Sequence, residues 1–158
     1  MHDIALLRLS EPLIYQSFIR PICLPSVNET IKHGERTMIT GWGSTRDTRH
    51  FRYLREVEVT IQSNEQCGFQ SINWETTLCA GLCENSTCDA CQVSVFIIVK
   101  NDKIRPLLQG DSGGPMILLR HGRWHIVGLI SWGFSCAGLG VYTKISYYSA
   151  WISSIINQ

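Results

Sequence analysis

The chain has 158 residues, with 14 Lys and Arg, 13 Asp and Glu, and 7 Cys. A formal net charge of +1 argues against nucleic-acid binding driven by charge. A hydrophobic content of 44% with 17% charged residues excludes a disordered chain. No apolar run approaches the roughly 18 residues that a membrane helix needs, so we expect no membrane segment in this chain.

Short strands separated by turn residues dominate the first part of the chain. Ile4–Leu9 is an almost unbroken apolar run, which predicts a fully buried strand. Leu54–Ile61 alternates apolar and polar residues, which predicts a half-buried strand with Val57, Val59 and Ile61 on its inner face.

The last part of the chain predicts a hairpin, a strand and a helix. Pro115–Arg120 and Trp124–Trp132 are β-prone and flank the turn residues His121-Gly122-Arg123. Gly140–Ile145 predicts another strand, and Ser146 is the expected N-cap of a C-terminal helix. Its apolar face consists of Tyr148, Trp151, Ile152, Ile155 and Ile156. The sequence therefore predicts an all-β, antiparallel domain closed by a helix.

The cysteine count points to a secreted type of protein. Seven cysteines suit an oxidising compartment, and an odd number leaves at least one thiol without a partner in this chain. Residues 1–20 nevertheless lack the features of a signal peptide. We therefore expect the sequence to be a piece of a longer protein.

The run Gly110-Asp111-Ser112-Gly113-Gly114-Pro115 carries the clearest chemical signal. A serine between glycines exposes its hydroxyl and leaves the backbone free to aim N–H groups at one point. Acyl transfer needs both a nucleophile and such an oxyanion hole. The alternative is an ordinary glycine-rich turn.

Further motifs follow one another in a characteristic order. They are Asp3-Ile4-Ala5-Leu6-Leu7-Arg8-Leu9, Arg20-Pro21-Ile22-Cys23-Leu24-Pro25, Thr40-Gly41-Trp42-Gly43, Leu78-Cys79-Ala80-Gly81, Asp89-Ala90-Cys91-Gln92, the serine motif, Ser131-Trp132-Gly133 and Gly140-Val141-Tyr142-Thr143-Lys144. Together they resemble the chymotrypsin/trypsin family of secreted serine proteases, and the resemblance runs from Asp3 to Trp151.

The resemblance implies a partial trypsin-like domain over residues 1–158. The family fold is an antiparallel double β-barrel, of which the second barrel is complete here and the first is mostly missing. Residues 1–27 correspond to the end of the first barrel and the crossover, and 28–145 to the second barrel. Residues 146–158 correspond to the C-terminal helix. The implied location is extracellular, either secreted or as the outer part of a membrane-tethered protease.

The resemblance also assigns catalytic roles. Ser112 matches the nucleophile, and the N–H groups of Gly110 and Ser112 match the oxyanion hole. Asp3 matches the acid that orients the catalytic histidine, although by itself it is also compatible with a solvated terminal carboxylate. That histidine lies upstream of Met1 in family order, and His2 does not replace it because adjacent strand residues point to opposite faces. We expect a serine endopeptidase that uses no cofactor and no metal.

Substrate recognition follows from the same resemblance. Asp89 matches the base of the primary specificity pocket, where an acid selects Arg or Lys in a polypeptide substrate. The alternative for Asp89 is a solvated loop carboxylate. Gly133 and Gly140 match the pocket walls, and Ser131, Trp132 and Gly133 match the strand that pairs with the substrate backbone.

Several features predict that this chain alone is inactive. It lacks the catalytic histidine, and without a base Ser112 is a weak nucleophile. Asp111 matches the residue that pairs with the α-amino group created by zymogen cleavage. Because a buried, unpaired carboxylate is costly, we expect a zymogen-like site. Residues 93–109 interrupt the family pattern just before Gly110, either as translated intron or as a real surface loop.

The resemblance pairs Cys67 with Cys79 and Cys91 with Cys136. It also matches Cys23 to the cysteine that tethers the domain to an upstream light chain or propeptide, which accounts for the odd count. Cys83 and Cys88 lie outside the usual set, and a local bridge between them is the expected pairing. The alternative is a zinc site formed by Cys79, Cys83, Cys88 and Cys91.

Asn28 and Asn85 begin glycosylation sequons, which agrees with secretion. The rival to an enzyme is a non-catalytic protease homologue that acts as a binding or regulatory module. Asp3, Asp89 and Ser112 favour the enzyme lineage, because a pure binding module has no need of all three.

Overall fold

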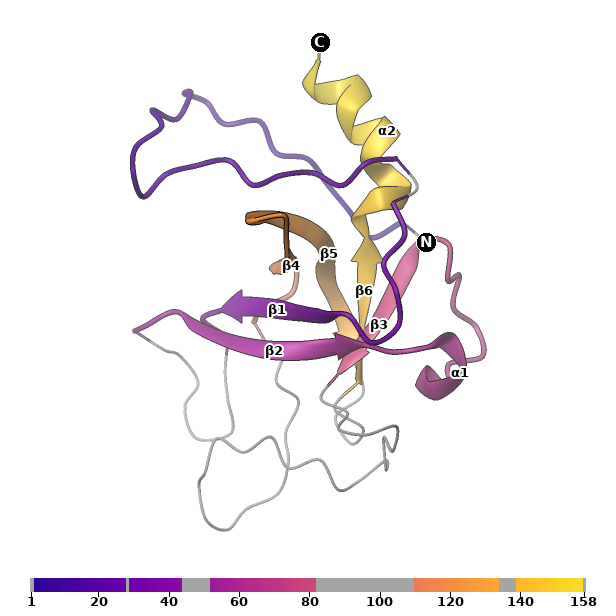
Figure 1. Ribbon diagram of the computed structural model, residues 1–158. Helices are drawn as coiled ribbons and strands as arrows, with labels where there is room; N and C mark the ends of the chain where they lie inside the picture. Colours follow the sequence, from indigo (N-terminus) through magenta and orange to yellow (C-terminus); the bar gives the residue numbers. More distant parts are fainter. Residues whose placement is uncertain (1, 28, 44–51, 82–109, 134–138, 158) are drawn as a thin grey trace.

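The computed structural model describes residues 2–27, 29–43, 52–81, 110–133 and 139–157. Their strands form one closed antiparallel barrel in the order β1-β2-β3-β6-β5-β4, with β4 returning to β1 (Figure 1). The strands are β1 (Arg36–Gly41), β2 (Arg55–Ile61), β3 (Thr77–Gly81), β4 (Pro115–Arg120), β5 (Arg123–Gly133) and β6 (Leu139–Lys144), and the helices are α1 (Asn64–Cys67) and α2 (Ile145–Ile156). The all-β prediction with a C-terminal helix is confirmed.

Side-chain alternation builds the barrel interior, as the pattern of β2 predicted. Val59 and Ile61 are buried and Val57 is half-buried, whereas Glu56 and Glu58 face solvent. The other strands fill the same core with Ile39, Leu78, Ala80, Met116, Leu118, Val127, Ile130 and Tyr142. Burial raises the pKa of the Tyr142 hydroxyl, so this side chain stays neutral in the core.

The predicted hairpin between β4 and β5 is present. His121 and Gly122 connect the strands with positive φ angles of 49° and 72°, and Arg123 already belongs to β5. A turn with two positive φ angles matches the right-handed twist of paired strands. The register of the hairpin runs from Pro115 opposite Leu129 to Arg120 opposite Arg123, with an irregularity between Met116 and Ile117.

The predicted N-cap of α2 is wrong. The helix begins at Ile145, directly after β6, and Lys144 occupies the cap position without a side-chain hydrogen bond. Ser146 lies inside the first turn and is 1% exposed. The apolar face is also shorter than predicted: Tyr148 and Ile152 are buried, but Trp151, Ile155 and Ile156 are largely exposed. Neither helix in the described ranges is long and apolar enough to span a bilayer.

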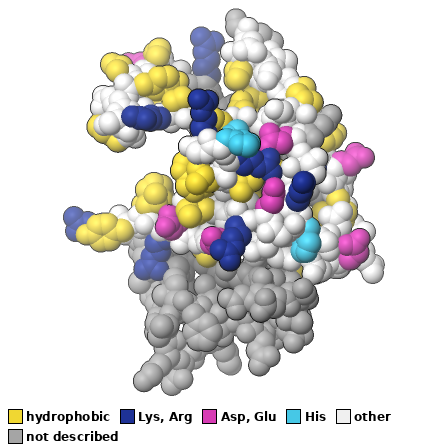
Figure 2. Space-filling view, in the orientation of Figure 1, with side chains coloured by type: hydrophobic (Ala, Val, Ile, Leu, Met, Phe, Trp, Pro, Cys, Tyr) yellow, Lys and Arg dark blue, Asp and Glu magenta, His cyan; other side chains and the backbone are white. Residues whose placement is uncertain are grey.

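The prediction of a buried strand at Ile4–Leu9 is also wrong. The segment has no strand pairing, and Leu7 is 91% exposed. In Figure 1 this indigo segment runs out from the barrel beside α2, and Figure 2 shows hydrophobic side chains on the corresponding lobe. No described strand pairs with this apolar segment. Burial requires such a partner, and the apolar pattern of the sequence does not show whether one is present. We call residues 5–22 the strap.

An ion-pair cluster and two backbone hydrogen bonds fasten the chain after the strap to the hairpin. The Arg120 guanidinium contacts both Glu29 and Glu35, and its Nη2 lies 2.7 Å from Glu35 Oε1. These side chains are about a quarter exposed or less, so the pairing is better shielded than a surface salt bridge. Cys23 bonds to the β5 backbone on either side of His125.

The barrel core predicts the response to truncation on β4. Leu118→Ala should lower the free energy of unfolding by about 2–5 kcal/mol, because it removes a buried side chain and leaves a cavity. Leu119→Ala is the matched control, since this neighbour is 53% exposed, and it should cost less than about 1 kcal/mol. Urea unfolding of both variants measures the difference; equal losses would contradict the assigned inward and outward faces.

Candidate active site

The Ser112 turn is held by backbone hydrogen bonds to β5. The Gly114 N–H donates to the Asp111 carbonyl (2.8 Å) and closes the turn. The Gly113 N–H donates to the Ile130 carbonyl (2.8 Å), and the Ile130 N–H donates to the Gly114 carbonyl (2.9 Å). Ser112 itself is exposed at the tip of the turn. The turn is therefore fixed to β5, and it leaves the Ser112 side chain accessible to solvent.

Two glycines are required by the shape of this turn. Gly113 has a φ of +83°, a conformation that side chains with a Cβ rarely adopt. A Cβ at Gly114 would lie 2.8 Å from the Asp111 carbonyl oxygen, which is too close. Gly110, assigned with Ser112 to the oxyanion hole, is exposed on the other side of Asp111.

Asp3 contacts Ser131, the β5 residue that follows Ile130. The Ser131 hydroxyl donates to Asp3 Oδ2 (2.5 Å), and the Thr143 hydroxyl donates to the Asp3 carbonyl (2.7 Å). The β5–β6 register shifts between Ile130 and Trp132, and such bulges re-aim the side chain between them. Asp3 and the Ser112 turn therefore attach to consecutive β5 residues.

The Asp111 carboxylate has a backbone partner. The Gly43 N–H donates to Asp111 Oδ1 (2.7 Å), and Asp111 is half-buried. A Cβ at Gly41 or Gly43 would overlap the carboxylate, so both residues must be small. Asp111 thus avoids the costly buried, unpaired state, because Gly43, just after β1, supplies a donor and the carboxylate keeps partial solvent contact. The zymogen-like state of the site stays a prediction.

The residues expected to meet the substrate lie at one end of the β5–β6 ladder. Gly133 pairs with Gly140, and Trp132 pairs with Val141. Trp132 is 43% exposed, and its ring centroid lies 5.2 Å from that of Phe69. Gly140 is buried, in contrast to exposed Gly133. The strand end thus combines a small residue, an exposed indole and the Ser131 hydroxyl.

Two histidine side chains have hydrogen bonds with groups other than the serine. His2 Nδ1 lies 2.8 Å from the Tyr148 hydroxyl, and His33 Nδ1 lies 3.1 Å from the Ile61 carbonyl. His2 thus contacts α2, whereas its neighbour Asp3 contacts β5. This opposite placement agrees with the expected alternation along an extended segment.

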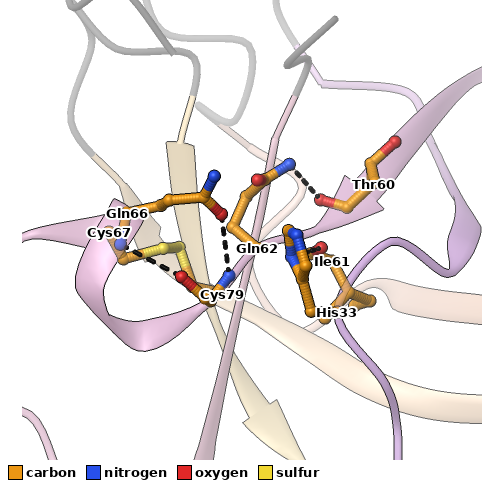
Figure 3. Close-up of a disulfide and its surroundings, with 8 residues drawn as sticks. His33, Thr60, Ile61, Gln62, Gln66, Cys67 and Cys79 are labelled. Carbon is orange, nitrogen blue, oxygen red and sulfur yellow. Dashed lines mark hydrogen bonds between the residues drawn. A yellow bond between two sulfur atoms is a disulfide. The ribbon is translucent and has the colours of Figure 1, made fainter. Parts of the chain in front are cut away.

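The disulfide between Cys67 and Cys79 is present and joins α1 to β3 (Figure 3). Its Cα atoms are 6.4 Å apart. The Gln62 N–H donates to the Cys79 carbonyl (2.9 Å), so backbone and sulfur bonds meet at the same point. Cys23 is a half-buried free thiol beside His125.

Several predicted features lie outside the described residues. They are Asp89, Cys83, Cys88, Cys91, Cys136, Asn28, Asn85 and the segment 93–109. The specificity pocket base, the remaining disulfides, the glycosylation sites and the insertion therefore stay predictions. Within the described ranges, no group of three or more His, Cys, Asp or Glu residues is arranged to hold a metal.

Comparison with known proteins identifies the family. The sequence model described as Trypsin matches residues 1–93 and 98–152. The chain belongs to the trypsin family of serine proteases.

Among curated relatives, human serine protease 41 is 34% identical over 171 residues, which cover 99% of this chain and 48% of that protein. Rat vitamin K-dependent protein C is 37% identical over 171 residues, which cover 99% of this chain and 33% of that protein. The chain thus spans about half or less of these relatives.

Sequence reasoning missed the supporting contacts made by Gly43, Thr143 and Tyr148. Gly43 and Thr143 lie inside motifs of the sequence, but a motif does not show which distant residue forms a hydrogen bond with each of them. Tyr148 looked like one more apolar residue of a helix face. Each contact joins residues far apart in the chain, for example Asp3 with Thr143, so local patterns could not reveal it.

The Asp111 contact generates a stability prediction. Asp111→Ala should lower the free energy of unfolding by about 1–2 kcal/mol, since it removes a partly exposed, charge-assisted hydrogen bond. Asp111→Asn should fall between wild type and Ala, because the amide oxygen still accepts. Urea unfolding measures stability, and the Gly43 amide proton shift reports the bond. Glu56→Gln, an exposed carboxylate on β2, is the control; an unchanged Gly43 resonance in Asp111→Ala would contradict the assignment.

Proposed function

We propose that the complete protein is a trypsin-like serine endopeptidase that cleaves after Arg or Lys through an acyl-enzyme on Ser112. One observation supports this most: Asp3 and the Ser112 turn attach to Ser131 and Ile130, adjacent residues of a single strand. A carboxylate and an exposed serine are then held on one rigid support. Family membership agrees with this chemistry.

In the proposed reaction, Ser112 Oγ attacks the carbonyl carbon of the substrate. A histidine from outside this chain accepts the serine proton and later delivers it to the leaving amine. Asp3 orients that histidine, while the Gly110 and Ser112 N–H groups stabilise the oxyanion. Water then releases the acyl group and regenerates Ser112.

We propose that the 158-residue chain alone is inactive. His2 and His33 are hydrogen-bonded through Nδ1 to the Tyr148 hydroxyl and the Ile61 carbonyl, and neither bond involves Ser112. Attack by a neutral serine without a base is slow. Residues 93–109, whether translated intron or a real loop, also fall directly before the proposed oxyanion hole.

The strap supports the proposed domain organisation, with residues 1–27 as the end of a first barrel. Leu7, Ile14 and Phe18 are 91%, 78% and 79% exposed, which is costly for an apolar segment without a partner. A first barrel supplied by the complete protein would cover these side chains. Residues 28–145 then form the second barrel with its insertion, and 146–158 its helix.

Further proposals concern partners and location. Cys23 is a free thiol outside the barrel core, which suits a tether to an upstream light chain or propeptide. The Cys67–Cys79 bridge suits an extracellular protein, as do the sequons at Asn28 and Asn85. The other proposed bridges are Cys91–Cys136 and Cys83–Cys88.

Activity-based labelling tests the proposed enzyme. The complete protein, isolated after proteolytic activation, should react with a fluorophosphonate at Ser112 and hydrolyse an Arg-nitroanilide peptide. Ser112→Ala should lower kcat/KM on the order of 10⁴-fold or more, because the nucleophile is gone. The 158-residue chain should give no labelling above its Ser112→Ala variant. An activated complete protein without Ser112 labelling would instead support a non-catalytic homologue.

The proposed role of Asp89 generates a separate prediction. Asp89→Ser in the complete protein should lower kcat/KM for an Arg substrate roughly 10³-fold or more, since the substrate cation loses its partner in the pocket. Hydrolysis of a Phe substrate should change far less. Glu75→Ser replaces an exposed carboxylate near β3 and serves as the control. Retained preference for Arg over Phe would remove Asp89 from the pocket.

A further inference from the structure

We propose that Thr143 and Tyr148 are positioning residues that clamp His2, Asp3 and Ile4 onto the barrel and so hold the Asp3 carboxylate at Ser131. The clamp's value for catalysis rests on the proposed function, in which Asp3 orients the histidine. Its existence as an anchor does not depend on that function.

Three consecutive residues each have their own anchor. His2 Nδ1 meets the Tyr148 hydroxyl at 2.8 Å, and the two rings also pack edge to face with centroids 5.7 Å apart. The Asp3 carbonyl accepts from Thr143 Oγ1 at 2.7 Å. Ile4 packs against the cluster that contains Tyr148. β6 and α2 therefore hold the segment independently of the Ser131 contact.

The directions of the side chains give the clamp its effect. In an extended segment, residues two apart share a side and the residue between them faces the other way. His2 and Ile4 both contact α2, and Asp3 reaches Ser131 on β5. Fixing the two outer residues on the helix thus sets the direction of the carboxylate between them.

The strap that follows Ile4 cannot provide this restraint. Over residues 5–22 of the described chain, the backbone hydrogen bonds join only Gln16 and Ile19 to each other. The next backbone attachment to the barrel is at Cys23. Leu7 is 91% exposed, so even the residues that directly follow Ile4 add little packing against the barrel.

The protonation state of Tyr148 fits the clamp. Burial raises the pKa of its hydroxyl, the nearby Tyr147 and Asp3 raise it further, and a side-chain hydrogen bond with Thr76 offsets part of the rise. The hydroxyl therefore stays protonated near neutral pH and remains available for the hydrogen bond with His2 Nδ1.

NMR of the 158-residue chain tests the clamp directly. In wild type, the backbone order parameters of His2, Asp3 and Ile4 should be near 0.85. Tyr148→Phe and Thr143→Val should each lower them to below about 0.6, and Tyr148→Phe should also shift the His2 Nδ1 resonance. Thr143→Ser should restore the wild-type values, because it returns the hydroxyl.

Tyr147→Phe is the matched control, because it removes a hydroxyl from the adjacent helix residue and should leave His2–Ile4 unchanged. Methyl spectra of the core verify folding, and the Thr143 pair decides the outcome if Tyr148→Phe does not fold. Rigid His2–Ile4 segments in Thr143→Val and in folded Tyr148→Phe would overturn the clamp. If the unmodified complete protein showed no Ser112-dependent activity, only the proposed function would be overturned. None of the NMR measurements of the clamp depends on hydrolysis.

Discussion

The backbone of β5 at Ile130 and Ser131 is the constraint on which the candidate site depends. Ile130 gives its N–H and carbonyl to the Ser112 turn, and Ser131 gives its hydroxyl to Asp3. The shift in register at this point turns the Ser131 side chain out of the regular ladder. Because β5 is paired on both sides in a closed barrel, the support cannot tilt without breaking two ladders.

The barrel and the strap differ in what stabilises them. Alternating side chains from all six strands in the described ranges close a common core, and a disulfide fastens α1 to β3. The strap has apolar residues of a similar kind, but most of their side chains are exposed and no other part of the described chain covers them. Hydrophobic sequence thus provides stability only where the topology brings a second apolar face within contact.

The elements whose own residues specify them, by alternation or by turn residues, were predicted correctly from the sequence. The alternation around Val57 and Val59 identified β2, and the His121-Gly122 turn identified the β4–β5 hairpin. The Ile4–Leu9 prediction failed because burial depends on a partner strand, which periodicity does not report. The serine motif marked its own position, but the contacts of Asp111 with Gly43 and of Asp3 with Ser131 arise only from the tertiary fold.

The strand order has a consequence for tolerance to changes in chain length. β3 pairs with β2 and β6, whereas β4 pairs with β1 and β5, so consecutive strands β3 and β4 are not neighbours. No ladder between them fixes the length of the connection that contains residues 93–109. Removing those residues would roughly halve the connection, which changes the entropy of loop closure by only about 0.6 kcal/mol. The same barrel can therefore close around a short or a long version of this connection.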